Sequence, residues 1–391
     1  MDPRIHDRAS RKWLVALVLL AVSSGLPAKV MTQEPAHVSS ADSGIVVSLA
    51  APEEYWTPER MAAAQPYPEQ AVFASATTVA TADALPVGDP GAVSGVPPQA
   101  SEEAALAAME SVTKMAGPAA GESVEPQHAG YPPPHTTWQW FGRYRTYPMS
   151  TIGKVFFNQD HDANGTVSSF VCSGSTIGNK YVLTAGHCVN NGRNGAGANG
   201  GWSTAFTFCP SYDSSQGGVN PAVGCWTAYN LATSGSWFSS SNFDRDWGGA
   251  AMNLCSSRNP PGCTTVGTAV GWLGRAWNWN DEHWHAFGYP AAAPYTGGKI
   301  IANGAEHSYT INQGTGADSK YQGNEMTGGS SGGPWIFRFG TGNWADGVNS
   351  HKRCTAAGCP PGSILTQEMG SPPFTSEAGG SEDFFAFLFT L

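Results

Sequence analysis

Beyond residue 138, apolar residues come in short runs that glycine, asparagine, serine and proline separate. Such runs, with almost no long helical period, are typical of β-strands. They predict strands at Lys154–Phe157, Ser168–Cys172, Tyr181–Thr184, Ala205–Phe208, Gly248–Met252, Val266–Val270, His283–Gly288, His307–Ile311, Gly333–Arg338 and Ala345–Asn349. Many short strands without intervening helices favour an all-β domain.

The beginning of the chain has a different pattern. Residues 1–28 start with basic side chains, continue through an apolar run at Trp13–Val22 and end in small residues at Ala28. This order is typical of a secretory signal. The apolar run is much shorter than the roughly 20 residues that span a bilayer, so an uncleaved anchor is the weaker interpretation.

Residues 29–135 are rich in alanine, proline, glutamate, serine and valine, and contain no cysteine. From residue 30 to 135 there are thirteen acidic and two basic residues. We expect no packed core here, apart from one helix that begins at Ser101 and runs to about Met115. Such a stretch is either a pro-segment or a disordered acidic spacer.

The rest of the chain, residues 136–391, is nearly neutral, with thirteen basic and fifteen acidic residues. A basic surface for nucleic acid is therefore not expected. An even number of cysteines behind an export signal indicates a disulfide framework in an oxidising compartment. All eight cysteines lie in this part: Cys172, Cys188, Cys209, Cys225, Cys255, Cys263, Cys354 and Cys359.

The stretch Met326–Trp335 reads Met-Thr-Gly-Gly-Ser-Ser-Gly-Gly-Pro-Trp and offers a candidate nucleophile, Ser331. Glycines around a serine allow a sharp turn and a close approach of main-chain N–H groups to a bound carbonyl. The N–H groups of Gly329 and Ser331 could together form an oxyanion hole. The alternative is a glycine-rich loop without chemistry.

A serine hydroxyl needs a base, and Thr184-Ala185-Gly186-His187-Cys188 supplies one in His187. This motif, followed far downstream by Gly-Ser-Ser-Gly-Gly-Pro, resembles the histidine and serine motifs of chymotrypsin-fold, trypsin-like serine endopeptidases. Ile152–Phe157, Gly288–Pro290 and Thr327–Trp335 are similar to secreted bacterial enzymes of the glutamyl endopeptidase-like branch. The resemblance covers about residues 145–375.

The resemblance implies two antiparallel six-stranded β-barrels, at about 145–256 and 264–375, with the active site between them. It also implies a carboxylate that orients His187. Asp246, followed by Trp247 and two glycines, has the expected setting, and Asp244 is the alternative.

The serine motif also fits Gly-x-Ser-x-Gly, which is typical of α/β-hydrolases. The order of the three residues along the chain separates the two families. An α/β-hydrolase runs serine, acid, histidine, whereas the order here is His187, Asp246, Ser331. An esterase is therefore not expected.

The resemblance also implies a Cys172–Cys188 disulfide. Proximity in the sequence suggests Cys209–Cys225, Cys255–Cys263 and Cys354–Cys359, among the 105 pairings that eight cysteines allow. A metal site is not expected, because the chain has no Cys-x-x-Cys pair, and no cofactor is needed.

Two features bear on activation and specificity. Ser330 stands where the trypsin-like family has the aspartate that pairs with a new N-terminus, so we expect activation by removal of a steric pro-segment. Glu325 is a candidate for the base of the substrate pocket, where it would favour arginine or lysine. Asn349 stands where glutamyl endopeptidases have a substrate-binding histidine.

The sequence therefore predicts a secreted, extracellular serine endopeptidase with a signal (1–28), a pro-segment (29–135) and a protease domain (136–391). We expect a monomer that acts on polypeptides without stable membrane association. The alternative is a secreted binding or adhesion module that keeps the fold without turnover.

Overall fold

The computed structural model describes residues 44–49, 55–73, 79–80, 88–98, 112–114, 134–141, 144–257, 263–279, 283–311, 319–354 and 367–391. The expected signal at 1–28 lies outside these residues. No helix in the described ranges is both long enough and apolar enough to cross a membrane.

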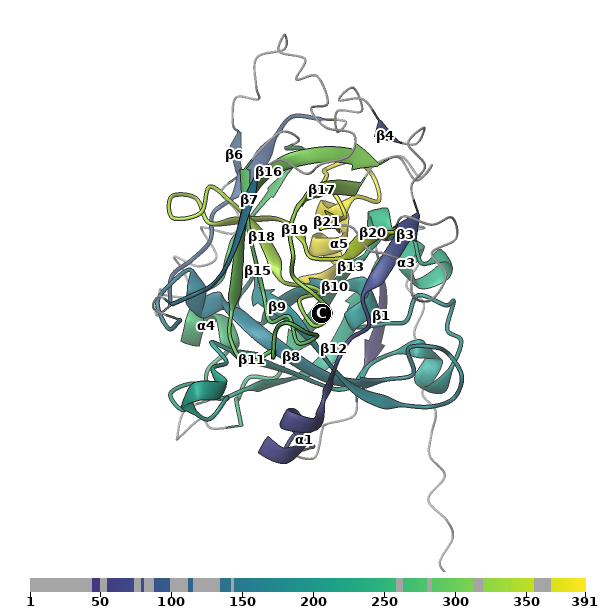
Figure 1. Ribbon diagram of the computed structural model, residues 1–391, viewed down its shortest axis with the longest axis vertical. Helices are drawn as coiled ribbons and strands as arrows, with labels where there is room; N and C mark the ends of the chain where they lie inside the picture. Colours follow the sequence, from purple (N-terminus) through teal and green to yellow (C-terminus); the bar gives the residue numbers. More distant parts are fainter. Residues whose placement is uncertain are drawn as a thin grey trace, which may run out of the picture. The chain divides into compact units, whose positions relative to one another are not determined.

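Six antiparallel strands close into a barrel within residues 152–252 (Figure 1). The order around the barrel is β8, β9, β10, β13, β12, β11 and back to β8. Closure pairs every strand on both edges, so main-chain N–H and C=O groups find partners. The strands are β8 (Ile152–Gln159), β9 (Ser168–Thr176), β10 (Tyr181–Ala185), β11 (Thr204–Pro210), β12 (Trp226–Thr233) and β13 (Trp247–Met252).

Eight strands of the second half follow one another in the order β20, β21, β17, β16, β15, β18, β19, β14. Together with the first barrel they confirm the all-β, chymotrypsin-like double-barrel fold. Their bounds are β14 (Gly274–Trp277), β15 (His283–Gly288), β16 (Ile301–Ile311), β17 (Ser319–Gly323), β18 (Pro334–Phe337), β19 (Trp344–Val348), β20 (His351–Cys354) and β21 (Glu368–Ser371).

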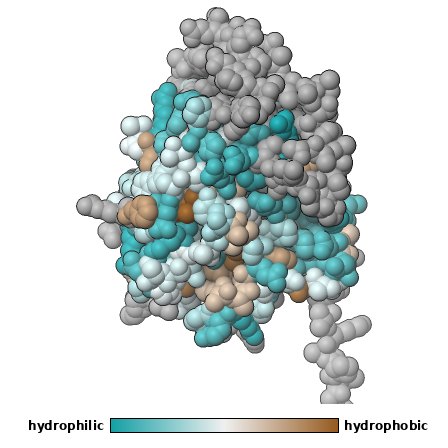
Figure 2. Space-filling model, in the orientation of Figure 1, coloured by the Kyte–Doolittle hydropathy of each residue, from teal (hydrophilic) through white to brown (hydrophobic). Residues whose placement is uncertain are grey.

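Helix α5 (Ser381–Leu388) covers one side of the first barrel. Its apolar residues Phe384, Phe385 and Leu388 are fully buried. Gly249 on β13 makes room for the helix, since a Cβ there would lie 2.5 Å from a Leu388 methyl carbon. The phenylalanine-rich C-terminus thus packs on the barrel. On the face in Figure 2, coloured hydrophobic residues are scattered among hydrophilic ones.

One expected strand is wrong. Val266–Val270 forms helix α4, not a strand. Thr265 begins the helix, because its hydroxyl accepts a hydrogen bond from the N–H of Thr268, and Gly271 ends it with a φ of +78°. The β-branched residues in this stretch favour a strand locally, and the caps at both ends override that preference.

The described parts of the region before residue 141 pack on strands from the rest of the chain. Trp56, Met61 and Tyr67 are buried. The pieces that pair with strands from beyond residue 141 are β1 (Ile45–Ser48) on β12, β2 (Gln65–Pro66) on β9, β3 (Gln70–Phe73) on β20, β4 (Val79–Ala80) and β7 (His135–Gln139) on β16, and β5 (Gly91–Val93) on β14.

Two short elements complete this region. Helix α1 (Pro58–Ala63) precedes β2, and β6 (Val112–Lys114) pairs with β5. The helix expected from Ser101 therefore does not include Val112–Lys114, and its other residues lie outside the described ranges. Composition did not predict these pairings, because short apolar pieces gain their partners only from strand edges elsewhere in the chain.

Candidate active site

Strand register brings His187 and Asp246 together. Ala185 at the end of β10 pairs with Trp247 at the start of β13, so the residues just beyond face each other. The main-chain N–H of Gly186 donates to the carbonyl of Asp246 over 3.0 Å. A Cβ on Gly186 would lie 2.8 Å from the Asp246 carboxylate, so only glycine allows this approach.

The Asp246 carboxylate holds His187 at two points. The His187 main-chain N–H donates to Oδ1, and ring Nδ1 lies 2.8 Å from Oδ2. Both residues are buried. A carboxylate at Nδ1 selects the tautomer with its proton there, which leaves a lone pair on Nε2. That Nε2 atom is buried and has no hydrogen-bond partner among the described residues.

A chain of polar side chains continues behind Asp246, and sequence reasoning missed it. Ser350 Oγ lies 2.6 Å from Asp246 Oδ2 and 2.8 Å from His351 Nδ1, and His351 Nε2 lies 2.7 Å from the Tyr321 hydroxyl. Burial, with the nearby His187, lowers the pKa of His351 to about 3. Neutral His351 can therefore donate a hydrogen bond through Nδ1 to the Ser350 hydroxyl, and that hydroxyl donates in turn to the Asp246 carboxylate.

Asp244, the alternative carboxylate, has a different role in the structure. It is buried, and its Oδ1 accepts hydrogen bonds from the main-chain N–H and the hydroxyl of Ser319, at 2.9 and 2.6 Å. Asp244 therefore anchors the start of β17, while Asp246 is the carboxylate at His187.

Glycines fit the Ser331 loop against the first barrel. Gly329 and Gly332 have φ angles of +94° and +81°, which favour glycine. A Cβ on Gly332 would lie 2.0 Å from the Thr184 hydroxyl and 2.5 Å from the Ser173 carbonyl. The loop thus rests on the strands that lead to His187.

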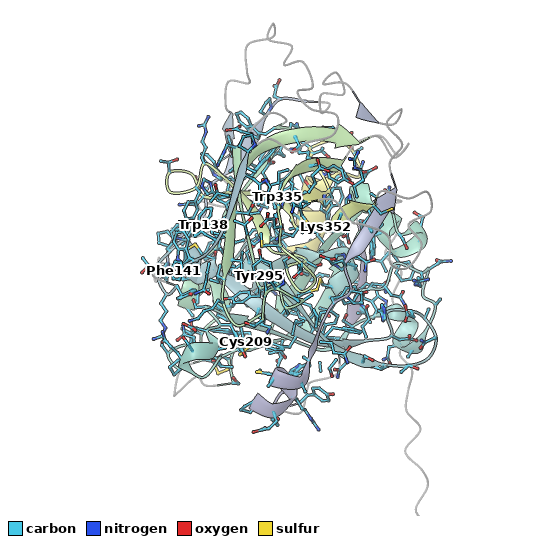
Figure 3. The ribbon with its side chains drawn as sticks, viewed as in Figure 1. Trp138, Phe141, Cys209, Tyr295, Trp335 and Lys352 are labelled. Atoms are coloured by element: carbon cyan, nitrogen blue, oxygen red, sulfur yellow. A yellow bond between two sulfur atoms is a disulfide. The ribbon has the colours of Figure 1, made fainter. Side chains whose placement is uncertain are left out.

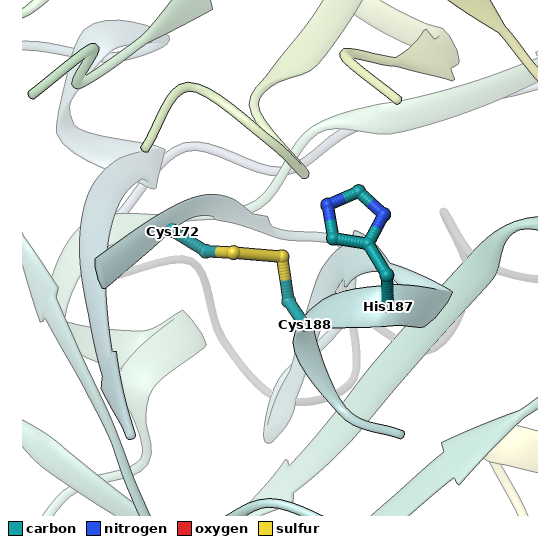
Figure 4. Close-up of side chains that lie close together, drawn as sticks. All are labelled: Cys172, His187 and Cys188. Atoms are coloured by element: carbon teal, nitrogen blue, oxygen red, sulfur yellow. A yellow bond between two sulfur atoms is a disulfide. The ribbon is translucent and has the colours of Figure 1, made fainter. Parts of the chain in front are cut away.

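The Cys172–Cys188 disulfide joins β9 to the segment that carries His187 (Figure 4). Cys188 follows His187 directly, and its sulfur lies 3.7 Å from the carbonyl oxygen of Ser331. That carbonyl also accepts a hydrogen bond of 2.7 Å from the N–H of Ser173. The main chain at Ser331 therefore lies next to Cys188, the residue after His187, and no hydrogen bond joins the side chains of His187 and Ser331 among the described contacts.

Two main-chain donors near Ser331 are free. The N–H groups of Gly329 and Ser331 donate to no acceptor among the described residues, whereas those of Ser330 and Gly332 are used. The Ser173 hydroxyl donates to the carbonyl of Gly329 over 2.9 Å and so orients that peptide. Two free N–H groups beside a serine suit a developing oxyanion.

The two expected specificity residues are placed differently from the expectation. The Glu325 side chain is 48% exposed and lies 3.8 Å from His135, so it is not a buried carboxylate at the base of a pocket. Asn349 is buried, and its Nδ2 donates to the carbonyls of Phe287 and Ser330 at 3.0 and 3.2 Å.

The oxygen of the Asn349 amide is hydrogen-bonded as well. Its Oδ1 accepts a hydrogen bond of 2.9 Å from the indole N–H of Trp335, which Figure 3 labels. With both ends of the amide engaged, Asn349 holds the Ser331 loop in place and has no free group for a substrate.

The disulfides rule out a metal at this site. Ligand atoms of Cys172, His187 and Cys188 lie within 4.8 Å of one another, but the two sulfurs are bonded together and cannot act as thiolates. Disulfides also join Cys209 to Cys225 and Cys255 to Cys263, the pairs expected from proximity. Cys354 is disulfide-bonded as well, and its expected partner, Cys359, lies outside the described residues.

A closed six-stranded barrel, a buried histidine–carboxylate pair and a glycine-framed serine are the features of chymotrypsin-fold serine proteases. A comparison with family models agrees, since residues 153–215 match the Trypsin family. The match supports a trypsin-like serine protease. No curated protein sequence matches it significantly.

Among solved structures, the chain is similar to a thermostable serine protease, AL20, from an extremophilic microorganism, at 30% identity and a TM-score of 0.49. That match covers 62% of this chain and 98% of the other. A second is the protease Anisep from Arthrobacter nicotinovorans, at 28% identity and a TM-score of 0.48, and the match covers 62% of this chain and 96% of the other. A third is a Glu endopeptidase, at 17% identity and a TM-score of 0.45, and the match covers 67% of this chain and 97% of the other.

Proposed function

We propose that this protein is a secreted serine endopeptidase that cleaves polypeptides through an acyl-enzyme. Ser331 is the nucleophile, His187 the general base and then the general acid, and Asp246 the group that orients the imidazole. The N–H groups of Gly329 and Ser331 form the oxyanion hole. The observation that carries the proposal is the 2.8 Å contact between His187 Nδ1 and Asp246, which leaves a buried Nε2 lone pair without a partner.

In the proposed reaction, Ser331 Oγ attacks the peptide carbonyl as its proton passes to His187 Nε2. The negative charge on the carbonyl oxygen is met by the two free N–H groups. When the carbon–nitrogen bond breaks, the leaving amine takes the proton from Nε2. Water then repeats the sequence on the acyl-enzyme and releases Ser331. Asp246 stays ionised throughout and stabilises the imidazolium.

The same proposal covers processing. Residues 1–28 direct export, residues 29–135 are a pro-segment, and 136–391 form the enzyme, which acts outside the cell as a monomer without a cofactor or stable membrane contact. The disulfides suit an oxidising compartment. Since Ser330 carries no charge to pair with a new N-terminus, removal of the pro-segment is what activates the enzyme.

A fluorophosphonate probe tests this function, because it reacts only with an activated serine. Purified protein with its pro-segment proteolytically removed should be labelled, and Ser331→Ala should not. Ser330→Ala is the matched control, since this neighbouring serine uses its hydroxyl to donate to Thr327 and should keep labelling. Absence of labelling in the wild type would instead favour a binding module on the same fold.

A further inference from the structure

One aromatic side chain from the region before the protease domain lies against the catalytic histidine. The ring centroid of Tyr67 is 5.1 Å from that of His187 and 5.2 Å from that of Phe170. Its main-chain N–H donates to the carbonyl of Val171 on β9 over 3.1 Å. Tyr67 is only 2% exposed, so it is inserted into the site and not laid over it.

The segment around Tyr67, Gln65–Phe73, crosses from one half of the fold to the other, and we call it the strap. It begins as β2, parallel to β9 of the first barrel, and ends as β3, parallel to β20 of the second half (Figure 1). Between them it passes the Ser331 loop, where a Cβ on Gly328 would lie 2.5 Å from the Tyr67 carbonyl oxygen. The strap therefore occupies the space that a substrate must enter.

The buried hydroxyl end of Tyr67 meets a hydrogen-bond acceptor. The Tyr67 hydroxyl donates to Gln159 Oε1 over 2.7 Å. Gln159 Nε2 faces the other way, towards the His187 carbonyl at 3.1 Å and the Ser203 hydroxyl at 3.0 Å. Because the Ser203 hydroxyl itself donates to the Cys188 carbonyl, it must accept from Gln159.

These contacts fix the orientation of the Gln159 amide and leave a buried carbonyl oxygen in need of a donor. Burial also raises the pKa of Tyr67, so its phenol keeps the proton that it donates. An aromatic ring without a hydroxyl would fill the same space and leave Oε1 unpaired, which is the costly case for a buried acceptor.

On the basis of the proposed protease function, we propose that the pocket formed by Phe157, Gln159, Phe170 and His187 is a tyrosine-binding subsite of the enzyme. In the full chain Tyr67 fills it, and the strap inhibits the enzyme. After the strap leaves, the pocket accepts a tyrosine side chain of a substrate in preference to phenylalanine.

The strap is not placed for cleavage. The N–H groups of Gly329 and Ser331 donate to no acceptor among the described residues, so no described carbonyl of the strap lies in the proposed oxyanion hole. The main-chain N–H of Tyr67 instead donates to the carbonyl of Val171 on β9. The strap therefore binds as an inhibitor and not as a substrate.

The inhibitory role is tested on the full chain by the rate of fluorophosphonate labelling. We expect Tyr67→Phe to be labelled about tenfold faster than wild type, since one hydrogen bond to a buried acceptor is lost. Tyr67→Ala should be faster still, and both signals should vanish with Ser331→Ala. Equal labelling rates for wild type, Tyr67→Phe and Tyr67→Ala would overturn the inhibitory role of the strap.

Trp56→Phe is the matched control. Trp56 is also a buried aromatic residue of the pro-segment, and its indole N–H donates to the carbonyl of Ala205 over 2.7 Å, away from His187. This variant loses one hydrogen bond as Tyr67→Phe does, and it should be labelled at the wild-type rate. An equal acceleration in both variants would mean a generally loosened pro-segment and would overturn the specific role of Tyr67.

The subsite itself is tested with peptides. The strap peptide Gln-Pro-Tyr-Pro-Glu-Gln-Ala-Val-Phe is added to full-chain Tyr67→Phe while labelling is followed, next to a peptide with phenylalanine in place of tyrosine. We expect the tyrosine peptide to protect Ser331 about tenfold better. Equal protection would overturn the subsite. If protein with its pro-segment removed is not labelled either, the proposed protease function fails. If that form is labelled and no full-chain variant is, the inhibitory role of Tyr67 fails, so the two failures are distinguishable.

Discussion

Asp246 accepts two hydrogen bonds from one residue, His187: the main-chain N–H donates to Oδ1 and ring Nδ1 to Oδ2, each over 2.8 Å. The first contact fixes the carboxylate relative to the main chain, and the second fixes the ring relative to the carboxylate. Ser350 adds a third hydrogen bond at Oδ2. A buried carboxylate held in this way can stabilise an imidazolium without rotating.

We expect Asp246→Asn to lower kcat by about 10⁴-fold, because an amide at this position can donate to Nδ1 and so favours the wrong tautomer. The fold should survive, since asparagine has almost the same shape. The measurement is kcat with a chromogenic peptide, with circular dichroism to confirm the fold.

Asp244→Asn is the control for this prediction. It weakens the contacts to Ser319 and so lowers the free energy of unfolding, but it should leave kcat within a few-fold of wild type. If Asp244→Asn lowered kcat as much as Asp246→Asn, the assignment of the orienting carboxylate would be wrong.

The sequence predicted what local motifs encode. His187 and Ser331 stand in short motifs whose turns follow from their glycines, and the Ser331 carbonyl lies 3.7 Å from the sulfur of Cys188, the residue after His187. Asp244 and Asp246 could not be separated, because they are two residues apart and only the strand register between β10 and β13 selects one of them.

Contacts between distant segments explain what the sequence could not predict. Tyr321, Ser350 and His351 form one polar chain only because β17 and β20 meet through β21. In the same way, Tyr67 finds its hydrogen-bond partner Gln159 at a separation of 92 residues. Neither set carries a local motif, so composition and spacing give no signal for them.

His351 should make stability depend on pH. The pKa of its buried ring is about 3 in the folded chain, below the ordinary value of about 6.5 expected after unfolding. Between these values the unfolded chain binds a proton that the folded chain does not. The free energy of unfolding should therefore fall as the pH drops from about 6.5 towards 3, by up to about 1.4 kcal/mol per pH unit from this residue.

Urea unfolding of wild type and His351→Asn at several pH values measures that contribution. The variant should be less stable near neutral pH and have a shallower slope in the acidic range. Tyr321→Phe is the control, because it removes the hydroxyl at His351 Nε2 but keeps the titrating ring, so it should lose stability and retain the slope. Equal slopes for wild type and His351→Asn would refute the prediction.

Asn349 should affect turnover with every substrate alike. In Asn349→Asp the two carbonyls of Phe287 and Ser330 face an acceptor in place of a donor, so the Ser331 loop shifts. We expect kcat to fall at least tenfold with arginine, glutamate and phenylalanine reporter peptides. A change in preference among these peptides, with kcat retained for one of them, would show that Asn349 contacts the substrate instead.

Two disulfides that close loops of equal length should differ in their effect on catalysis. Cys172–Cys188 and Cys209–Cys225 each have a sequence separation of 16, so the chain-entropy model assigns each about 3 kcal/mol of stability. Only the first touches the active site, through the contact between Cys188 Sγ and the Ser331 carbonyl. Replacing either pair with alanine should therefore lower the free energy of unfolding by a similar amount.

Catalysis should separate the two double variants. Without Cys172–Cys188 the segment that carries His187 is no longer fixed to β9, and a small displacement of a catalytic group is enough to slow acylation. We expect kcat/KM to fall about tenfold or more in that variant and to stay near the wild-type value without Cys209–Cys225. Urea denaturation and kcat/KM, measured on the same preparations, provide the test. An equal loss of kcat/KM in both variants would mean that the first disulfide acts through stability alone.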